Sequence, residues 1–425
     1  MYTRLRTVRT VAAMGIAAVT VAALAGCSRA DVGGDTESTG EALPAGSSPE
    51  EFQEALADME PVELVFQTPS ISPDSVDSVP TVTFIERVEE YSGGKITLDT
   101  AWASGIVANP VEVDKALEDG RIDIASGWPQ YNPSEYPVTN LLVDLTITRD
   151  PQLIQGWYAT MAAMNEATLQ TPEAMAEYTD KGITPLAPMS PDGPSVFFCT
   201  EPLTSLADLE GKQVRSGSVV ASRQIEALGA VPVSMPFTEI YEALQRGILD
   251  CSLSGHGIAT SSGHTEVAPY VINPTTASFA PTPTNFYAGP AYESLPVPAQ
   301  QIILESLDVM RGMQIEGGFV RVADVLSAAV AENGGEFLAF DPEVDERLAE
   351  VNDEIIADVA ATDLLDGEEL VKRVEDANAR WLAEVEGLGY VDEGPVEDVS
   401  EWFEPTDPTA WTDAVSVEIT QPRFS

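Results

Sequence analysis

Two stretches of the chain share one pattern: VDKALEDGRID (residues 113–123) and IYEALQRGILD (residues 240–250). Both contain Ala-Leu-x-x-Gly-x-x-Asp, with an apolar residue three positions before the alanine. Apolar residues at i, i+3 and i+4 form one face of a helix, and the glycine stands where helices end in the left-handed conformation. A short apolar run after each glycine is typical of a strand. Each copy therefore predicts a helix, a glycine stop and a strand, although such punctuation is common in α/β proteins.

Segments typical of strands and helices alternate around both copies. The expected strands cover residues 64–67, 95–101, 213–214 and 231–233. The expected helices cover residues 78–91 and 222–228, and two more begin at the caps Asn109 and Thr238. Such alternation predicts parallel sheets, so we expect an α/β chain with two similar lobes.

Residues 1–26 have the features of a bacterial lipoprotein signal. Three arginines precede the apolar stretch 11–24, which is short for a membrane span. The stretch ends in Leu24-Ala25-Gly26-Cys27, which resembles a lipobox and predicts that Cys27 is lipidated and anchors the mature chain. An ordinary cleaved signal with an incidental cysteine is the alternative. Residues 27–60 are mostly small, polar or acidic, and we predict a flexible tether there.

An exported chain folds in an oxidising compartment, which matters for Cys199 and Cys251. Each borders a predicted strand, so a disulfide and two buried free thiols are both compatible with the sequence. The two histidines, His256 and His264, lie in what reads as a loop and a helix start. We therefore expect no metal site, no cofactor and no thiol catalysis.

The charge balance is strongly acidic, with 21 Lys and Arg against 69 Asp and Glu. Removal of residues 1–26 leaves 18 against 69, a net charge of −51. Nucleic acids and anionic membrane surfaces are therefore poor partners. We predict an acidic, well-hydrated surface like those of proteins from salty habitats, with an ordinary acidic secreted protein as the alternative.

The segment 206–250 resembles the solute-binding proteins of TRAP (tripartite ATP-independent periplasmic) transporters, the DctP-like family. LADLEGKQVR (residues 206–215) and LGAVPVSMPFTEIYEALQRGILD (residues 228–250) are similar to that family's successive motifs. Looser matches extend the resemblance over about residues 64–390. It implies a two-lobed α/β fold like that of periplasmic binding proteins, with a hinge between the lobes and a long helix bracing both.

The resemblance also predicts the boundaries of the lobes. Lobe one is expected to cover residues 61–193 and 279–326, and lobe two residues 194–278 and 327–390. The chain should cross between them near residues 184–198 and 275–287, and the helical stretch 297–333 should brace both lobes. Residues 391–425 form an acidic C-terminal extension beyond the usual family end. Its aromatic residues Trp402, Phe403 and Trp411 favour docking on a lobe.

The resemblance implies a ligand site in the cleft. Arg215 matches the arginine that holds the ligand carboxylate in this family, and a planar guanidinium suits bidentate pairing with a carboxylate. Phe237 is expected to pack on the ligand or in the core. Ser254 lies near a family position that is often an asparagine and hydrogen-bonds the ligand, and serine has a shorter side chain for that contact. Trp128 and Tyr131 are expected to wall the cleft or join the core, and Asn285 to contact the ligand or fix the hinge.

Departures from the family pattern narrow the range of expected ligands. The stretch SVFFCT (residues 195–200) lacks the second arginine that some relatives carry. This disfavours a sialic-acid-like ligand and favours a monocarboxylate with an apolar or hydroxylated body. The family's glycine after the second repeat is replaced by Cys251.

The resemblance implies an extracytoplasmic lipoprotein, anchored to the cell membrane, that delivers a small carboxylate ligand to a TRAP membrane permease. The sequence has no G-x-x-x-x-G-K-[ST] loop, so the energy for transport must come from the partner. A ligand-presenting protein for a membrane sensor kinase is an alternative. An enzyme on the same fold is disfavoured because the predicted cleft offers no histidine or cysteine pair.

Overall fold

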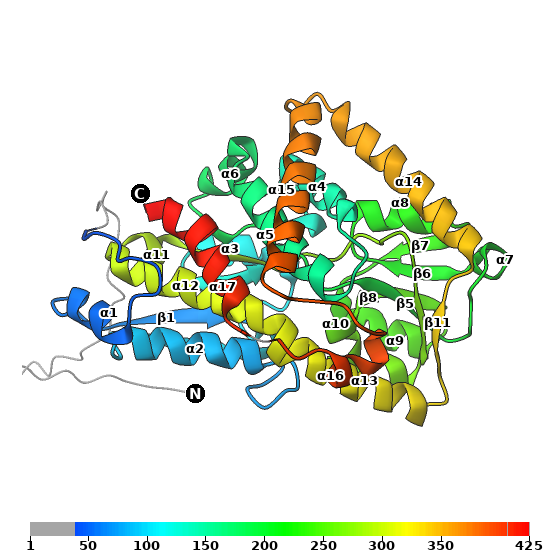
Figure 1. Ribbon diagram of the computed structural model, residues 1–425, viewed down its shortest axis with the longest axis horizontal. Helices are drawn as coiled ribbons and strands as arrows, with labels where there is room; N and C mark the ends of the chain where they lie inside the picture. Colours follow the sequence, from blue (N-terminus) through cyan, green and yellow to red (C-terminus); the bar gives the residue numbers. More distant parts are fainter. Residues whose placement is uncertain (1–38, 406, 425) are drawn as a thin grey trace, which may run out of the picture. The chain divides into compact units, whose positions relative to one another are not determined.

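The computed structural model describes residues 39–405 and 407–424, so the predicted signal peptide, Cys27 and the first part of the predicted tether lie outside the described residues. Two β-sheets with helices packed around them make up this part of the chain (Figure 1). Among the helices of the described residues, none combines the length and the apolar character that crossing a bilayer requires.

The first sheet has the strand order β2-β1-β3-β10-β4 and the second the order β11-β9-β5-β8-β6-β7. The strands of the first sheet are β1 (Val62–Gln67), β2 (Ile96–Ala101), β3 (Ile124–Gly127), β4 (Thr184–Ala187) and β10 (Asn285–Ala288). Those of the second are β5 (Ser195–Cys199), β6 (Gln213–Ser216), β7 (Val231–Ser234), β8 (Cys251–Gly255), β9 (Tyr270–Asn273) and β11 (Phe337–Ala339).

The α-helices are α1 (Pro49–Ala55), α2 (Val79–Tyr91), α3 (Val113–Glu118), α4 (Pro137–Asp144), α5 (Ile154–Leu169), α6 (Pro172–Thr179), α7 (Leu206–Leu209), α8 (Val219–Ala227), α9 (Ile240–Gln245), α10 (His256–Ser261), α11 (Pro290–Glu293), α12 (Val297–Met313), α13 (Val320–Glu332), α14 (Pro342–Ala360), α15 (Gly367–Gly387), α16 (Val399–Trp402) and α17 (Ala410–Val415). Short 3₁₀ and π segments include η2 (Pro110–Glu112), η4 (Leu145–Thr148), η5 (Phe237–Glu239) and η7 (Gln314–Phe319).

Both sheets combine parallel pairs with one strand that runs against its neighbours. β1 is parallel to β2 and β3, and β6 is parallel to β7 and β8. β10 is antiparallel to β3 and β4, and β5 is antiparallel to β8 and β9. The chain leaves the first sheet between β4 and β5 and returns between β9 and β10, which confirms the two predicted crossings.

A third connection runs along the helices. α12 packs against α2 beside the first sheet, α13 packs against α10 beside the second, and the π-helical η7 joins them (Figure 1). Residues 297–332 are thus one nearly continuous helical rod. The prediction of a long helix that braces both lobes is confirmed.

The two copies of the repeat adopt the same local structure. Gly120 and Gly247 both have a φ of 68°, the left-handed conformation that ends the preceding helix. The carboxylate of Asp123 accepts a hydrogen bond of 2.8 Å from the backbone N–H of Val65, and that of Asp250 accepts one of 2.8 Å from Gln213. Each aspartate therefore ties its strand to the neighbouring parallel strand, β1 in the first lobe and β6 in the second, which explains the spacing.

The helix caps before the two repeats differ. Asn109 accepts a hydrogen bond from the N–H of Val111, as predicted, although the first turn is the 3₁₀ segment η2. The prediction of a cap at Thr238 is wrong, because Thr238 lies inside η5 and Pro236 stands at the cap. The φ of a proline is fixed near the value that starts a turn.

The prediction of a flexible tether over residues 27–60 is wrong from residue 39 onward. Ser48 and Glu51 form a capping box at the start of α1, and Phe52 is fully buried against the first lobe. The backbone of Leu43 exchanges two hydrogen bonds of 2.8 Å with the side chain of Gln301. The polar composition of this stretch obscured a short helix with one buried face.

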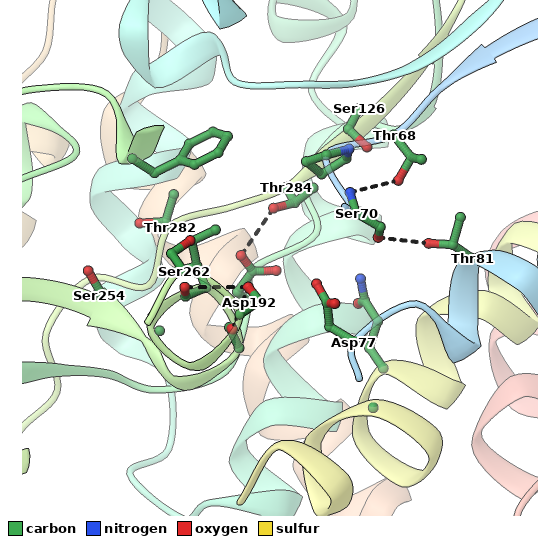
Figure 2. A pocket seen from close by; sticks show the side chains of 18 of the residues that line it. Thr68, Ser70, Asp77, Thr81, Ser126, Asp192, Ser254, Ser262, Thr282 and Thr284 are labelled. Atoms are coloured by element: carbon green, nitrogen blue, oxygen red, sulfur yellow. Dashed lines mark hydrogen bonds between the residues drawn. The ribbon is translucent and has the colours of Figure 1, made fainter. Parts of the chain in front are cut away.

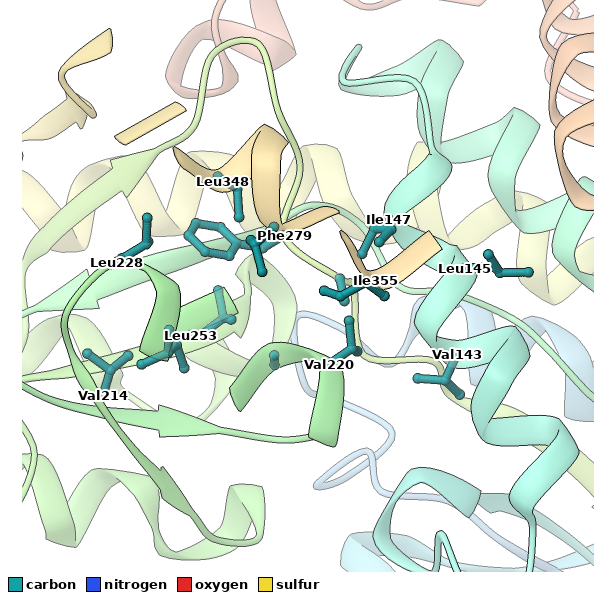
Figure 3. Packing of buried hydrophobic residues seen from close by; sticks show 14 of the residues in the cluster. Val143, Leu145, Ile147, Val214, Val220, Leu228, Leu253, Phe279, Leu348 and Ile355 are labelled. Carbon is teal, nitrogen blue, oxygen red and sulfur yellow. The ribbon is translucent and has the colours of Figure 1, made fainter. Parts of the chain in front are cut away.

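The hydrophobic core of the second lobe includes residues from a segment that was predicted to belong to the first lobe. Val143, Leu145 and Ile147, from α4 and η4, belong to one buried cluster with Val214 and Val220 of the second lobe (Figure 3). In the other direction, α14 packs against α8 as expected for lobe two, but α15 returns along α5. The observed lobes are thus more interleaved than the predicted boundaries.

The C-terminal extension docks on the face formed by α5 and α12. Trp411 is fully buried and its Nε1 donates a hydrogen bond of 3.1 Å to the carbonyl of Tyr158. Arg423 donates two hydrogen bonds to carbonyls of β4, at 2.6 Å to Leu186 and 2.7 Å to Pro185. The aromatic residues of the extension therefore contribute to the core.

Cys199 and Cys251 form a disulfide in the structure. They face each other directly in the antiparallel pairing of β5 with β8, and both are fully buried. Of the two alternatives compatible with the sequence, the structure has the paired one.

Candidate functional site

A cavity of about 450 Å³ lies between the two sheets. Residues at or just after the carboxyl ends of strands form much of its wall, since Thr68 follows β1, Ser126 is on β3, Arg215 on β6 and Ser254 on β8. The crossovers contribute Asp192, Thr282 and Thr284, and the helical brace contributes Met310 and Phe319. The edge where the strands of an α/β sheet end is the usual place for a ligand, and the volume suits a small molecule.

Arg215 carries the positive charge of this cavity wall. Its side chain is 2% exposed and donates three hydrogen bonds, to the carbonyls of Met235 (3.1 Å) and Leu253 (3.2 Å) and to the hydroxyl of Tyr131 (3.1 Å). All three acceptors are neutral, and Arg215 forms no ion pair with any carboxylate of the described residues. A buried charge without a partner is costly, so this guanidinium is suited to receive an anion.

Gly217 leaves space for this guanidinium. A Cβ atom at residue 217 would lie 3.0 Å from both terminal nitrogens of Arg215. A larger residue there would displace the guanidinium or the backbone, so the glycine is part of the construction of the charged wall.

Two contacts cross the cavity from one lobe to the other. The ring of Trp128, after β3, lies 5.7 Å from the ring of Phe237 on the second lobe, measured between centroids. The hydroxyl of Tyr131, also on the first lobe, meets Arg215. Together these contacts bring the lobes together over the cavity and give it an aromatic wall.

Comparison with known proteins assigns the family. Residues 70–363 match the family model described as bacterial extracellular solute-binding protein, family 7 (DctP). The chain belongs to this family. The match covers more than half of the sequence and includes both repeats, but ends before α15 and the C-terminal extension.

This solute-binding protein is similar to several characterised relatives over part of their length. It is 27% identical over 197 residues to the C4-dicarboxylate-binding periplasmic protein DctP of Rhodobacter capsulatus, covering 45% of this chain and 55% of the relative. It is 26% identical over 208 residues to the ectoine-binding periplasmic protein TeaA of Halomonas elongata, covering 48% and 58%. The chain thus spans little more than half the length of these relatives.

Solved structures share the fold of this solute-binding protein over nearly their whole length. A marine metagenome TRAP solute-binding protein in complex with 3-hydroxybenzoate has a TM-score of 0.64 at 22% identity, covering 76% of this chain and 99% of that one. DctP7 of Bordetella pertussis, a receptor binding pyroglutamic acid, has a TM-score of 0.59 at 20% identity, covering 74% and 99%. The predicted two-lobed fold is confirmed.

The structure of the solute-binding protein gathers five of the six predicted site residues in the cavity wall: Arg215, Phe237, Ser254, Trp128 and Tyr131. Ser254 also shares a hydrogen bond of 2.6 Å with Ser252. Asn285 is the exception. It is fully buried on β10 outside the lining, and its Oδ1 accepts a hydrogen bond of 2.9 Å from the N–H of Ser190. Of the two interpretations of Asn285, the structure favours fixing the crossover.

Two acidic residues of the cavity, Asp77 and Asp192, were not predicted from the sequence. Figure 2 shows both among hydroxyl side chains, and Thr284 donates a hydrogen bond of 3.0 Å to Asp192. Burial raises the pKa of Asp192 to about 7, and the hydrogen bond from Thr284 lowers it to a smaller extent. Burial also raises the pKa of Asp77. The buried Oδ1 of Asp77 has no hydrogen-bond partner among the described residues. The position of Asp192 in a crossover between lobes was the available signal.

The two histidines are buried in the second lobe, and His256 lines the cavity. Burial lowers the pKa of each to about 4, helped by the charge of Arg149 at His256 and of Arg215 at His264. Both rings are therefore neutral near pH 7. In the part of the chain that the structure describes, no group of three or more His, Cys, Asp or Glu side chains is placed to hold a metal ion.

Proposed function

We propose that this solute-binding protein captures a small organic acid in the interlobe cavity, with the ligand carboxylate paired to Arg215, and delivers it to a TRAP membrane permease. The observation that carries the proposal is the buried guanidinium at the cavity wall, whose three hydrogen-bond acceptors are all neutral. A carboxylate would supply the missing negative charge and match the planar fork.

Binding would be coupled to closure of the lobes. A ligand shifts the equilibrium toward a closed state only if it contacts both lobes and so prefers that state. Here Arg215 and Phe237 come from the second lobe, whereas Trp128 and Tyr131 come from the first. A ligand seated on Arg215 beneath the aromatic pair would therefore contact both.

The charges of the cavity support a ligand with one carboxylate. Among the described residues of the lining, Arg215 is the cation, and Asp77 and Asp192 are the two acids. The ionised form of either acid would repel a second carboxylate, whereas a hydroxyl or ammonium group would donate a hydrogen bond to it. Solved proteins of similar fold are in complex with 3-hydroxybenzoate, pyroglutamic acid and galactonate, which supports a small organic acid.

Native mass spectrometry of the freshly purified protein tests the ligand class. We expect a bound organic acid with one carboxylate, and titration calorimetry of the same compound should return a dissociation constant that Arg215→Ala weakens. As a second route, a panel of 3-hydroxybenzoate, pyroglutamate, galactonate and succinate can be titrated. Conversion of the bound acid into a product would reveal an enzyme and overturn the proposal.

The anchor and the partner are tested in cells. We propose that Cys27 is lipidated and holds the protein on the outside of the cell membrane. Radiolabelled fatty acid should be incorporated into the wild type and not into Cys27→Ser. Uptake of the identified acid should require the permease genes. Normal uptake without them, together with loss of a sensor-kinase response when this protein is deleted, would favour the kinase alternative.

A further inference from the structure

A second cavity has a volume of about 500 Å³. His256 lines both cavities, and the remaining walls of the second come from the segment after η4, from β5, from the β9–β10 crossover and from β11. Residues 394–397 of the C-terminal extension complete the wall. This part of the wall lies beyond the stretch that matches the family, so the cavity is in part a product of the extension.

Among the described residues in the wall of this second cavity, Arg149 is the cation. Its side chain is 6% exposed, yet it donates one hydrogen bond in the described structure, from Nη2 to the carbonyl of Gln152 at 3.1 Å. No carboxylate of the described residues forms an ion pair with it. The buried Arg311, by contrast, is 3.6 Å from the carboxylate of Asp308.

Two carboxylates lie in the neighbourhood of Arg149 but are engaged elsewhere. Asp150 accepts a hydrogen bond of 2.9 Å from the N–H of Gln152. Asp392 accepts hydrogen bonds from the N–H groups of Ile154 and Gln155, at 2.9 and 3.0 Å. Burial lowers the pKa of Arg149 to about 10, and the charges of Asp150 and Asp392 oppose that change. Arg149 is therefore charged at neutral pH, with most of its donors unused.

Neutral donors surround the same space. The hydroxyls of Ser195 and Ser278 and the amide of Asn273 belong to the lining, and His256 is neutral there. Glu397 is the acid of the wall, at the side formed by the extension. One buried cation, several neutral donors and one acid suit a small anion of single charge and disfavour a polyanion.

We propose that this cavity is a second binding site, for a small planar oxyanion of single charge that pairs with the fork of Arg149 beneath the C-terminal extension. The anion would supply the counter-charge that Arg149 lacks. Because it would bridge the second lobe and residues 394–397, its binding should stabilise the folded chain. The site is separate from the ligand cavity and does not depend on what that cavity binds.

Thermal unfolding in sodium acetate, sodium nitrate and sodium chloride of equal concentration tests the proposal, because the three salts have the same ionic strength. We expect acetate or nitrate to raise the melting temperature above that in chloride, with acetate representing carboxylates and nitrate inorganic oxyanions. The concentration for half the effect should rise at least tenfold in Arg149→Gln. Arg246→Gln, which removes the same charge from an exposed ion pair with Glu242, should behave like the wild type.

The variant Arg215→Ala separates the two cavities. An anion effect that persists in Arg215→Ala and is lost in Arg149→Gln supports the second site. An effect lost in Arg215→Ala and kept in Arg149→Gln places the anion in the ligand cavity, and an effect equal in all variants is unspecific; either result overturns the proposal. If Arg149→Gln does not fold, crystals of the wild type soaked in bromoacetate decide, since no bromine signal beside Arg149 would also overturn it.

Discussion

The two lobes place different side chains at equivalent positions beside the cleft. Val65 and Gln213 are equivalent, because each donates its backbone N–H to the aspartate of its own repeat. Two residues later stand Gln67 in the first lobe and Arg215 in the second, and both are 2% exposed. Their strand partners also correspond, Ala125 for Gln67 and Ser252 for Arg215.

This equivalent position has a different role in each lobe. The side-chain oxygen of Gln67 accepts hydrogen bonds from the N–H groups of Ile106 and Val107, and its amide donates to the carbonyl of Val107. Gln67 is thus fully used in holding a loop, and it does not line the cavity. Arg215 presents a charge to the cavity instead. Under the proposed function, one lobe would bind the carboxylate and the other would close over it with Trp128 and Tyr131.

Arg215→Ala should have the largest effect. Removing one partner of a buried charged pair costs roughly 3–5 kcal/mol, which corresponds to a loss of about two to four decades in affinity at about 1.4 kcal/mol per decade. Arg215→Lys should recover only part of the loss, because ammonium lacks the planar fork. Titration calorimetry with the acid recovered from the purified protein measures both.

Arg223→Ala is the matched control for that experiment. Arg223 lies on α8 of the same lobe, where it is partly exposed and pairs with Asp358 at 2.6 Å. Its loss should change affinity little. Equal affinities for the wild type and a folded Arg215→Ala would remove Arg215 from the site and with it the asymmetry of the lobes.

The disulfide sharpens the comparison, because only the second lobe has one among the described residues. Cys251 is the neighbour of Val214 in the sheet, and the equivalent residue of the first lobe, the neighbour of Phe66, is Ile124. The bridge joins residues separated by 52 positions, and closing a loop of that size stabilises by roughly 4 kcal/mol. Reduction should therefore lower the stability of the second lobe by about that amount.

Hydrogen exchange with and without reductant locates the effect. Protection should fall first in β5, β6 and β8 and later in β1 and β3. Intact mass after alkylation provides the check on the bond itself. Two alkylated thiols in the unreduced folded protein would contradict the pairing.

The features that the two lobes share could be predicted from the sequence more completely than the features in which they differ. The repeats and the alternation of strands and helices in each half follow from local patterns of apolar residues and glycine, and the bracing helix follows from the resemblance to the family. Five cavity residues follow from a motif. Asp77, Asp192 and Arg149 do not, because their significance arises from long-range packing that buries an ionisable group without an ion pair in the described structure. The docking of α1 and the course of α15 likewise depend on which distant surface an amphipathic helix finds.

Gln67→Ala tests the other half of the comparison. The N–H groups of Ile106 and Val107 would lose their acceptor. Ile106 is exposed and its N–H can bind water, whereas Val107 is buried, and one unsatisfied buried group costs about 1–3 kcal/mol. We expect the free energy of unfolding, measured by urea denaturation, to fall by that amount, while affinity for the acid changes less than tenfold. A large loss of affinity with unchanged stability would mean that Gln67 belongs to the binding site after all.

The smallest expected effect concerns Asp192, which belongs to the crossover that both lobes share. Its pKa in the folded protein is raised to about 7 by burial, so the folded state holds a proton that the unfolded state releases near pH 4. Stability contributed by this group is therefore lost as the pH rises from about 4 to about 7. Asp192→Asn stays neutral and should escape that loss.

The side chain of Asp192 is partly accessible to solvent, which reduces the effect. We therefore expect the free energy of unfolding of Asp192→Asn to increase relative to that of the wild type by about 1 kcal/mol between pH 5 and pH 8. Urea denaturation of both proteins at the two pH values measures the difference. Asp208→Asn serves as the control, because Asp208 belongs to an exposed capping box and the pKa of its carboxyl group is lowered. A wild type whose stability relative to Asp192→Asn rises with pH would show that Asp192 is stabilised as an anion, and the crossover would then have to supply it with a donor beyond Thr284.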